Sequence, residues 1–446
     1  MEFSRAEFEA LESVGVTRAW NGLGGSHTFV TYPPLDALRS LSPEPVLSRL
    51  IDVRDFSLYV HIPYCEMTCP FCPYERTAIS ESAAADTYLR ALFMEMKAIS
   101  GKLQKGVVQS LYVGGGTATI LHEAQLKSLM GSLKDHFQFS TDCVICIETS
   151  PNALVENSAK AGLLKELGVN RVSVGVQTLS ETALRSEGRT HTPDETMRML
   201  SELIREIHTV NVDLMQDMPG QTDDDMENDL ALIASLRPTQ ITSYVERLRK
   251  WHGEYPDSYR SVVRRLSLRD TLLELSYQPR PGGRFTRNGG AEDPFKNVRC
   301  GVTSNLIGLG ASSYGHVSGV FYRNIVDTGA YINLIHAGQS PIATGLPMSD
   351  VDVMAGSLAS GIRWGVRLPQ SYLGRDEYLD DAKRKLDVLI EHKLVRFDGD
   401  RELYEITLDG FGWAYEEEIC SLFVPQNIVD GIRAKNLPWW SSVLNH

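Results

Sequence analysis

The 446-residue sequence predicts an α/β protein: a partial (β/α)6 TIM-like barrel followed by a smaller, winged-helix-like α+β domain. Through the first half of the chain, short apolar stretches alternate with amphipathic helical patterns. This alternation is typical of parallel strands joined by right-handed crossovers. The motifs that could bind ligands follow directly after the apolar stretches, as they do at the C-terminal ends of barrel strands. A doubly wound open sheet is the competing topology, and the position of the motifs favours the barrel.

Six strands and five helices are expected in the barrel. The strands are 56–61, 110–114, 144–148, 171–176, 211–215 and 240–245. The helical patterns between them are 83–103, 123–137, 158–167, 193–207 and 224–236. One helix start is well marked, because Thr192 can cap it and Pro193 suits its first turn.

The rest of the chain divides into three expected regions around the barrel core at 56–250. An N-terminal extension (1–55) contains a helical pattern at 7–14 and is expected to pack against the core. A connecting region (251–345) that completes the barrel contains a helical pattern at 260–275 and a small-residue turn beside an apolar strand at 304–315. The C-terminal domain (346–446) shows a helix at 373–393 followed by a hairpin at 394–408. This winged-helix-like pattern lacks a concentrated basic face, so we expect a structural or lid domain and not a DNA-binding one.

Composition and charge narrow the class of protein. With 42% hydrophobic and 23% charged residues the chain is typical of globular proteins. Its net charge of −13 argues against a nucleic-acid partner. Without a run of eighteen apolar residues or the features of a signal peptide, we expect a cytoplasmic protein with no membrane partner. Seven cysteines, an odd number, suit a reducing compartment.

The stretch 59–72 carries the most specific chemical signal. Cys65, Cys69 and Cys72 stand at C-x3-C-x2-C spacing in a loop after the first expected strand. A [4Fe–4S] cluster takes four thiolates, so three in one short loop could hold it and leave one iron open. Structural zinc is the alternative, but such sites often combine two separated cysteine pairs, and no second pair at usable spacing follows. The spacing favours the cluster.

The next two strands end in residues that could bind a ligand beside the cluster. The glycine run 114–116 precedes Thr117, and such a turn lets backbone groups approach a ligand closely. Glu148 ends the third expected strand, where a carboxylate can accept both hydroxyls of a ribose. Capping of the following helix is the alternative for Glu148, and the context favours the ribose.

Three polar residues follow at the fourth and fifth strands. Gln177 and Asp213 lie on or at the ends of these strands, and Arg189 lies about a dozen residues beyond Gln177. Together they could recognise a second polar ligand, because arginine pairs with a carboxylate through two hydrogen bonds. Judged from residue types alone, a structural ion-pair network inside the barrel is the more common outcome.

The remaining cysteines are not expected to bind metal. Cys143 and Cys146 form a C-x2-C pattern, but residues three apart on a strand point to opposite faces. With Cys300 and Cys420 they are expected to be small buried hydrophobes or free thiols.

Taken in order, these motifs resemble those of the HemN-like radical S-adenosylmethionine (SAM) enzymes, which are related to oxygen-independent coproporphyrinogen dehydrogenase. The resemblance runs from about residue 58 to about residue 408. It is carried by the stretches 58–63, 114–117, 168–177, 211–214, 219–222 and 308–311, together with the cysteines. It implies a barrel of radical SAM type with a HemN-type C-terminal domain.

The resemblance also implies a set of ligands. The three cysteines would hold a [4Fe–4S] cluster, and two SAM molecules would bind side by side. The positions that match contacts to the first SAM are Tyr59, Gly115, Glu148 and Tyr314. Those that match contacts to the second are Phe71, Gly116, Thr117, Gln177, Arg189 and Asp213. No catalytic residue is expected beyond these ligands.

Departures from the family pattern point to a branch. Coproporphyrinogen dehydrogenases carry a further cysteine two residues after the third ligand, where this chain has Tyr74. The heme-chaperone branch resembles this chain there but usually begins almost at the cluster strand, whereas residues 1–55 precede it here. Asp217 stands where the family usually has Gly. The pattern looks more like the HemN-like methyltransferases and cyclopropanases of natural-product biosynthesis, or the heme-opening anaerobilin synthases.

We therefore expect a methyltransferase or cyclopropanase that transfers a SAM-derived methyl or methylene group to an sp2 carbon of an unsaturated or aromatic small molecule. The resemblance implies that a 5′-deoxyadenosyl radical from one SAM takes hydrogen from the methyl group of the other, so catalysis is chiefly positioning. Expected partners are that substrate, an electron donor such as flavodoxin or ferredoxin, and a partner methyltransferase. The alternatives are a tetrapyrrole enzyme, by heme ring opening or coproporphyrinogen decarboxylation, and a heme chaperone.

Overall fold

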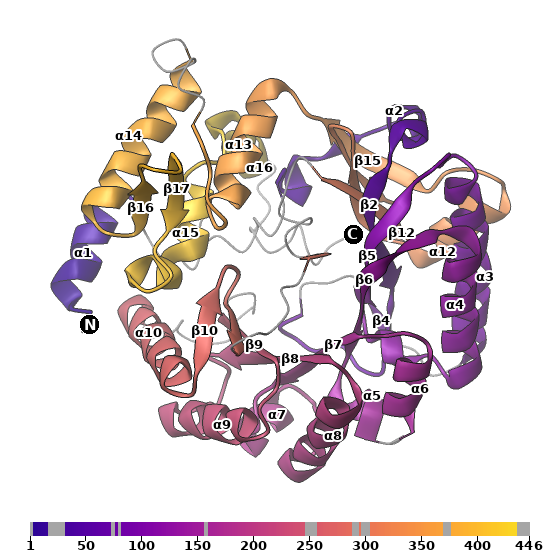
Figure 1. Ribbon diagram of the computed structural model, residues 1–446, viewed down its shortest axis with the longest axis horizontal. Coiled ribbons are helices and arrows are strands. Elements are labelled where there is room, and N and C mark those ends of the chain that lie inside the picture. The colour runs from indigo at the N-terminus through magenta and orange to yellow at the C-terminus, as the bar shows by residue number, and fades with distance from the viewer. Residues whose placement is uncertain are drawn as a thin grey trace.

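The computed structural model describes residues 3–16, 32–72, 76–78, 82–155, 159–245, 257–287, 294–295, 304–368 and 376–434. Within these residues one mixed sheet runs in the order β1-β15-β14-β13-β12-β2-β5-β6-β7-β8-β9-β11-β10. Figure 1 shows its strands curving around the centre of the molecule, with helices on the outside. The sheet has β1 and β10 as its two edges, so the barrel stays open.

The six expected barrel strands are confirmed, and all of them run parallel. They are β2 (Asp55–Ile62), β5 (Val107–Gly115), β6 (Gln138–Thr149), β7 (Arg171–Gln177), β8 (Thr209–Gln216) and β9 (Gln240–Val245). The helices between them are α3 (Ser82–Ser100), α4 (Glu123–His136), α5 (Pro151–Val155), α6 (Lys160–Glu166), α7 (Glu181–Ser186), α8 (Pro193–Glu206) and α9 (Asp223–Ser235). The short helices α5 and α7 were not expected. The α8 start is as predicted, with Thr192 accepting a hydrogen bond from the backbone of Glu195.

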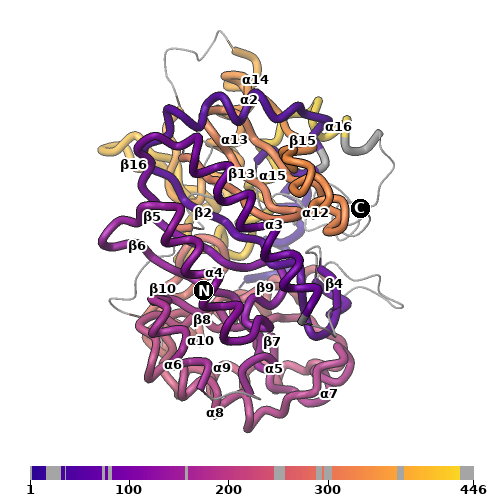
Figure 2. The backbone as a smooth tube through the Cα atoms, turned by 90° about the vertical axis from the view of Figure 1, so that its right-hand side faces the viewer, coloured from indigo at the N-terminus to yellow at the C-terminus, as the bar shows by residue number. Residues whose placement is uncertain are grey.

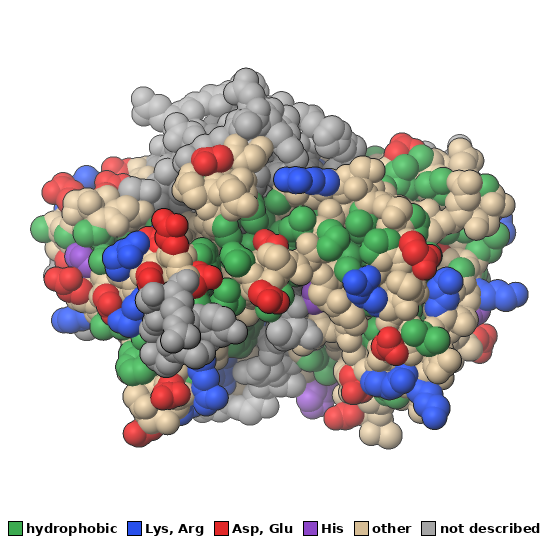
Figure 3. Space-filling view, turned by 90° about the horizontal axis from the view of Figure 1, so that it is seen from above, with side chains coloured by type: hydrophobic (Ala, Val, Ile, Leu, Met, Phe, Trp, Pro, Cys, Tyr) green, Lys and Arg blue, Asp and Glu red, His purple; other side chains and the backbone are tan. Residues whose placement is uncertain are grey.

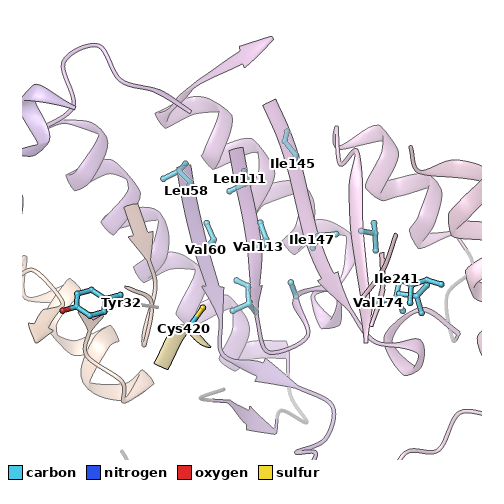
Figure 4. Packing of buried hydrophobic residues seen from close by; sticks show 14 of the residues in the cluster. Tyr32, Leu58, Val60, Leu111, Val113, Ile145, Ile147, Val174, Ile241 and Cys420 are labelled. Atoms are coloured by element: carbon cyan, nitrogen blue, oxygen red, sulfur yellow. The ribbon is translucent and has the colours of Figure 1, made fainter. Parts of the chain in front are cut away.

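Alternation along the strands separates an apolar outer face from a polar inner face. Figure 4 shows outer-face side chains of three neighbouring strands lying side by side: Leu58, Val60, Leu111, Val113, Ile145 and Ile147. They share one core with helix residues such as Leu92 and Leu129. On the inner face the strands are linked by polar contacts, among them Ser57 with Ser110 (2.6 Å) and Thr242 with Asn211 (2.7 Å). Burial against the outer helices therefore fixes the register, and the inner face is left for polar chemistry.

The segment after β9 extends the sheet at both edges. After α10 (Ser258–Glu274), the hairpin of β10 (Tyr277–Arg280) and β11 (Arg284–Arg287) adds antiparallel to β9. At the other side β12 (Asn305–Leu309) pairs parallel with β2. The sheet then continues antiparallel through β13 (Tyr314–Val317), β14 (Val320–Asn324), β15 (Ile342–Pro347) and β1 (Arg39–Ser40).

The C-terminal part has the expected helix-then-hairpin order. Its elements are α13 (Asp350–Gly361), α14 (Glu377–Glu391), β16 (Val395–Asp398), β17 (Leu403–Ile406), the 3-10 helix η6 (Phe411–Tyr415), α15 (Glu416–Ser421) and α16 (Gln426–Ala434). Helix α12 (Thr328–His336) precedes this part, between β14 and β15. Figure 2 shows α13–α16 towards one end of the molecule and α5–α9 towards the other. None of the described helices is long and apolar enough to cross a membrane. On the face seen in Figure 3, acidic and basic side chains are interspersed.

A buried polar contact joins this C-terminal part to the β10–β11 hairpin. Glu416, 1% exposed, accepts hydrogen bonds from the Gly282 backbone N–H (2.7 Å) and from Arg363 Nε (2.5 Å). Trp413 packs beside it, with its ring 5.1 Å from that of Phe285 and under the Arg265 guanidinium. The contact is therefore a packed interface with a buried ion pair at its centre.

The N-terminal helix α1 (Arg5–Ser13) reaches the same region. The Phe3 ring lies 4.8 Å from Phe411 and 6.1 Å from Tyr415, both in η6. From α10, the Tyr259 hydroxyl donates to the Phe3 carbonyl (3.0 Å), and its ring lies 5.8 Å from Phe8. The expected helix is thus present, and this aromatic group joins α1, α10 and η6.

Helix α3 places a fully buried carboxylate against the turn that follows β12. Glu95 accepts hydrogen bonds from the Gly310 N–H (2.7 Å), Asn324 Nδ2 (2.8 Å) and the Tyr331 hydroxyl (2.6 Å). Nearby, the Tyr88 hydroxyl donates to the His61 carbonyl (2.6 Å). Burial raises the pKa of Glu95 from 4.5 to about 7, although these donors oppose the rise.

This raised pKa predicts a pH-dependent stability. The stabilising contribution of neutral Glu95 is complete below the ordinary pKa near 4.5 and is lost as pH rises through about 7, because only the folded state holds the proton in that window. The contribution of Glu95 to the free energy of unfolding should fall by at most about 3 kcal/mol across it. In E95Q this contribution should disappear, while the falling contribution of Asp229, whose pKa burial raises to about 6, and the rising contribution of His191, whose pKa burial lowers to about 4, should remain. Urea titrations across the window measure the slope, and an unchanged slope in E95Q, relative to a control E123Q at an exposed site, would contradict the assignment.

Candidate active site

The cysteine loop is joined to the glycine turn of the next strand. Cys65 lies in the short strand β3 (Tyr64–Cys65), which follows β2 and pairs with β4 (Thr77–Ala78). The Gly116 N–H donates to the Ile62 carbonyl and the Thr117 N–H to the Tyr64 carbonyl, both at 2.8 Å. The two motifs therefore form one rigid unit at the C-terminal ends of β2 and β5.

A tight turn and one arginine hold the cysteine loop. The Cys72 N–H donates to the Cys69 carbonyl (3.1 Å). The Arg76 guanidinium donates to the carbonyls of Cys69 (2.5 Å) and Cys72 (2.9 Å). Arg76 was not predicted, because nothing in its local sequence distinguishes it from an exposed arginine.

The sulfur atoms lie beside hydrogen-bond donors and positive charge. The Thr117 hydroxyl lies 3.7 Å from Cys65 Sγ, and Arg189 Nη2 lies 3.8 Å from Cys69 Sγ. Burial raises the pKa of the Cys65 thiol, while the Thr117 hydrogen bond and the Arg76 charge lower it. The Thr117 and Arg76 contacts therefore act against burial and in favour of the thiolate, which is the form that ligates metal.

These cysteines fit an iron–sulfur cluster. In the part of the chain that the structure describes, no three His, Cys, Asp or Glu side chains converge closely enough to hold a single metal ion. A cubane cluster instead takes each thiolate at a different iron, so it needs ligands spread along a loop. Cys65, Cys69 and Cys72 are spread in this way, and Thr117 and Arg189 can donate to the sulfurs.

The glycine turn serves packing as well as ligand approach. Gly115 has a φ of +107°, and a Cβ there would come within 2.5 Å of the His61 ring. A Cβ on Gly116 would lie 3.0 Å from Cys65 Sγ and closer still to the Tyr64 carbonyl oxygen. The sequence predicted these glycines as a ligand turn, but their contact with the cysteine loop is visible only in the structure.

Glu148 is held against the glycine turn. Its carboxylate accepts hydrogen bonds from the Tyr112 hydroxyl (2.5 Å) and the Gly115 N–H (3.0 Å). Tyr112 belongs to an aromatic group on the inner face that also contains the predicted site residues Tyr59 and Tyr314. Ring centroids lie 5.3 Å apart for Tyr59 and Tyr314, and 4.3 Å apart for the stacked pair Tyr112 and Phe295. Tyr112 and Phe295 were missed, although Tyr112 shares a strand face with Gly114.

Arg189 and Gln177 lie at the neighbouring strand end. Arg189 is 9% exposed, donates to the Gly175 carbonyl (2.7 Å) and places its guanidinium 5.7 Å from the Phe71 ring centroid. Gln177 has a φ of +72°, and its buried Oε1 has no hydrogen-bond partner among the described residues. A buried acceptor without a partner is costly, so this amide is suited to receive a ligand donor.

Asp213 accepts hydrogen bonds from its own strand, β8, and from the adjacent strand, β7. It accepts hydrogen bonds from the Ser173 hydroxyl (3.0 Å) and from Asn211 Nδ2 (2.8 Å), and it stands opposite Gly175 in the register of β7 and β8. The structure thus brings Gln177, Arg189 and Asp213 to one end of this strand pair.

The other cysteines behave as expected where they can be seen. Cys143, Cys146 and Cys420 are buried. Cys300 and the subfamily marker Tyr74 lie outside the described residues.

Comparison with known proteins agrees with this geometry. Residues 59–233 match the Radical SAM superfamily. Heme chaperone HemW of Mycobacterium tuberculosis is 25% identical over 369 residues, which is 78% of this chain and 90% of that protein. Oxygen-independent coproporphyrinogen III oxidase of Pseudomonas aeruginosa is 28% identical over 353 residues, 73% of this chain and 76% of that protein. These matches support the HemN-like radical SAM family.

A solved structure supports the fold independently. The structure of coproporphyrinogen III oxidase (HemN) from Escherichia coli aligns with a TM-score of 0.77 at 22% identity, over 89% of this chain and 96% of that one. The partial barrel with a further C-terminal domain is therefore confirmed. The match of residues 59–233 to the Radical SAM superfamily points to a [4Fe–4S] cluster and SAM as cofactors.

The relatives do not support the expected branch. Their names are those of a heme chaperone and an oxidase, and methyl transfer or cyclopropanation is not among them. The number of SAM molecules and the individual SAM contacts remain predictions.

Proposed function

We propose that this chain is a HemN-type radical SAM enzyme that acts on a tetrapyrrole. One observation carries the proposal: relatives that align with 78% and 73% of the chain are named for heme and for coproporphyrinogen. This replaces methyl transfer to a small unsaturated molecule as the preferred function.

The cluster, held by Cys65, Cys69 and Cys72, would supply the electron that splits SAM reductively. The protein binds and orients SAM. Glu148, fixed by Tyr112 and Gly115, would accept the ribose hydroxyls. Gly116 and Thr117 would bring backbone groups to the ligand beside the cysteine loop.

A second ligand position is proposed at the ends of β7 and β8. Gln177 would accept a donor from that ligand, and Arg189 would bind a carboxylate. A second SAM is the predicted ligand there. Anaerobic equilibrium dialysis of wild type and R189Q, which counts the SAM molecules bound per cluster, tests this prediction.

The inner face has groups suited to a tetrapyrrole. A tetrapyrrole combines ring faces with acidic side chains. In the aromatic group of Tyr59, Tyr112, Phe295 and Tyr314 the first three rings are buried and Tyr314 is partly exposed, so Tyr314 is the ring that could stack on a tetrapyrrole. Buried Arg284 stands opposite Thr242 in the register of β11 and β9, and Thr242 faces the inner-face residue Asn211. An arginine there could pair with a substrate carboxylate, which the net charge of −13 of the whole chain would otherwise repel.

One assay separates the candidate functions. The cluster is reconstituted anaerobically, and the enzyme receives reductant, methyl-deuterated SAM and either heme or coproporphyrinogen III. The expected result is 5′-deoxyadenosine formed with substrate-dependent carbon dioxide release or with an opened heme ring. If neither tetrapyrrole is converted, while a parallel reaction with an unsaturated aromatic acceptor places deuterium in both 5′-deoxyadenosine and product, the proposal is overturned.

A heme chaperone is the second candidate, because the alignment covers 90% of a protein named for that role. In the same assay it predicts stoichiometric heme binding without turnover. Protein that neither binds nor converts either tetrapyrrole would contradict both candidates. Flavodoxin or ferredoxin remains the predicted electron donor.

A further inference from the structure

The turn after β8 contains a buried acid in a backbone conformation that favours glycine. Asp217 has a φ of +62°, and its side chain is 1% exposed. Glycine adopts such a φ without steric cost, so local geometry alone does not favour aspartate here. The reason for an acid must lie in what its carboxylate contacts.

Both oxygens of that carboxylate are bound by α10. The Ser261 hydroxyl donates to Asp217 Oδ2 (2.8 Å), and Arg264 Nη1 donates to Oδ1 (2.6 Å). Arg264 also donates through Nε to Asp223 at the start of α9 (2.5 Å). One arginine thus ties the turn after β8 to two helices, and its side chain is only 15% exposed.

Met215 at the end of β8 and Met218 in the following turn contribute to the surroundings of the cysteine loop. Met215 and Met218, 9% and 3% exposed, pack with Phe71 and Ala183, and Cys69 and Cys72 pack against this group. We call Met215 and Met218 the methionine wall. Gln221 braces it from the other side, because its amide donates to the Met215 carbonyl (3.1 Å) and accepts from the Met218 N–H (3.3 Å).

We propose that Asp217 and Arg264 are positioning residues that hold the methionine wall against Cys69 and Cys72. Asp217 lies between the two methionines in sequence, so a shift of its backbone moves both. The apolar shell around a metal centre controls solvent access and local dielectric, and therefore its potential. Anchored from α10, the wall keeps water and oxygen from the cluster on the Phe71 side. This role depends on the cluster and not on the identity of the substrate.

The test compares D217G with R260Q in the full-length, anaerobically reconstituted protein. D217G keeps the positive φ but removes both carboxylate contacts. R260Q removes a different contact of α10, the exposed ion pair between Arg260 and Asp223 (2.7 Å). It leaves the contact between Asp217 and Arg264 intact. The readouts are the rate at which the cluster absorbance bleaches in air, the midpoint potential of the cluster and the circular dichroism of the apoprotein.

We expect D217G to bleach about tenfold faster than wild type with a shifted potential, whereas R260Q should match wild type. D217N, which keeps an acceptor for Ser261, and R264Q should fall between them. A D217G protein that folds but bleaches and titrates like R260Q would overturn the proposal. So would loss of apoprotein folding in D217G, D217N and R264Q together, because the pair would then support the whole fold and not the wall. A failure of tetrapyrrole turnover affects none of these readouts.

Discussion

Serine at Cys65, Cys69 or Cys72 should abolish reductive SAM cleavage and lower the iron content of reconstituted protein. Each residue supplies one of three local ligands, and a hydroxyl is a poor substitute for a thiolate at iron. Because altered outer-shell partners alone cost 10–100-fold in affinity or activity, loss of a ligand should cost more than about 100-fold. Iron and sulfide analysis, with 5′-deoxyadenosine formation, measures the effect.

Cys143 is the matched control. It is also buried, but it lies on β6 and outside the cysteine loop, so C143S should retain iron and activity. If C69S kept full iron and SAM cleavage, the cluster assignment would be wrong.

Glu416→Gln should cause the largest loss of stability. It removes the negative charge that Glu416 places beside Arg363, whose side chain is 8% exposed, and weakens acceptance from the Gly282 N–H. Breaking a buried ion pair on one side costs about 3–5 kcal/mol. The free energy of unfolding from urea titration should fall by that amount, and limited proteolysis should cut the C-terminal part sooner.

An exposed ion pair provides the comparison. Lys383 and Asp387 pair on the surface of α14, with the Asp387 side chain 57% exposed, so D387N should change stability by less than about 1 kcal/mol. Equal effects of E416Q and D387N would show that the C-terminal part does not depend on the Glu416 contact.

Local patterns made the barrel predictable. In strands such as 171–176, apolar residues that pack in the main core alternate with polar or small ones, so composition and periodicity reveal them. The strands that flank the six barrel strands were harder to predict. β12 pairs with β2, which lies far away in the sequence, and β10 and β11 are short and polar. Such strands are specified by the neighbours they meet, and a single window of sequence does not contain those neighbours.

The residues of the candidate site also differ in whether local sequence reveals them. The cysteines could be predicted because three ligands in one loop are encoded by spacing alone. Arg76, Tyr112 and Phe295 could not, because their roles arise from contacts between separate elements. Asp217 was visible as a departure from a family pattern, but its reason required both its backbone angle and the position of Arg264 on another helix.

The aromatic contact between α1 and η6 has a consequence for biosynthesis. Phe3 leaves the ribosome long before its partners Phe411 and Tyr415 are made. Until then one side of Phe3 and of Tyr259 stays uncovered on the nascent chain. This aromatic contact can therefore form only after almost all of the chain has been synthesised. Truncated translation products that lack η6 should expose this apolar surface, to which chaperones can bind.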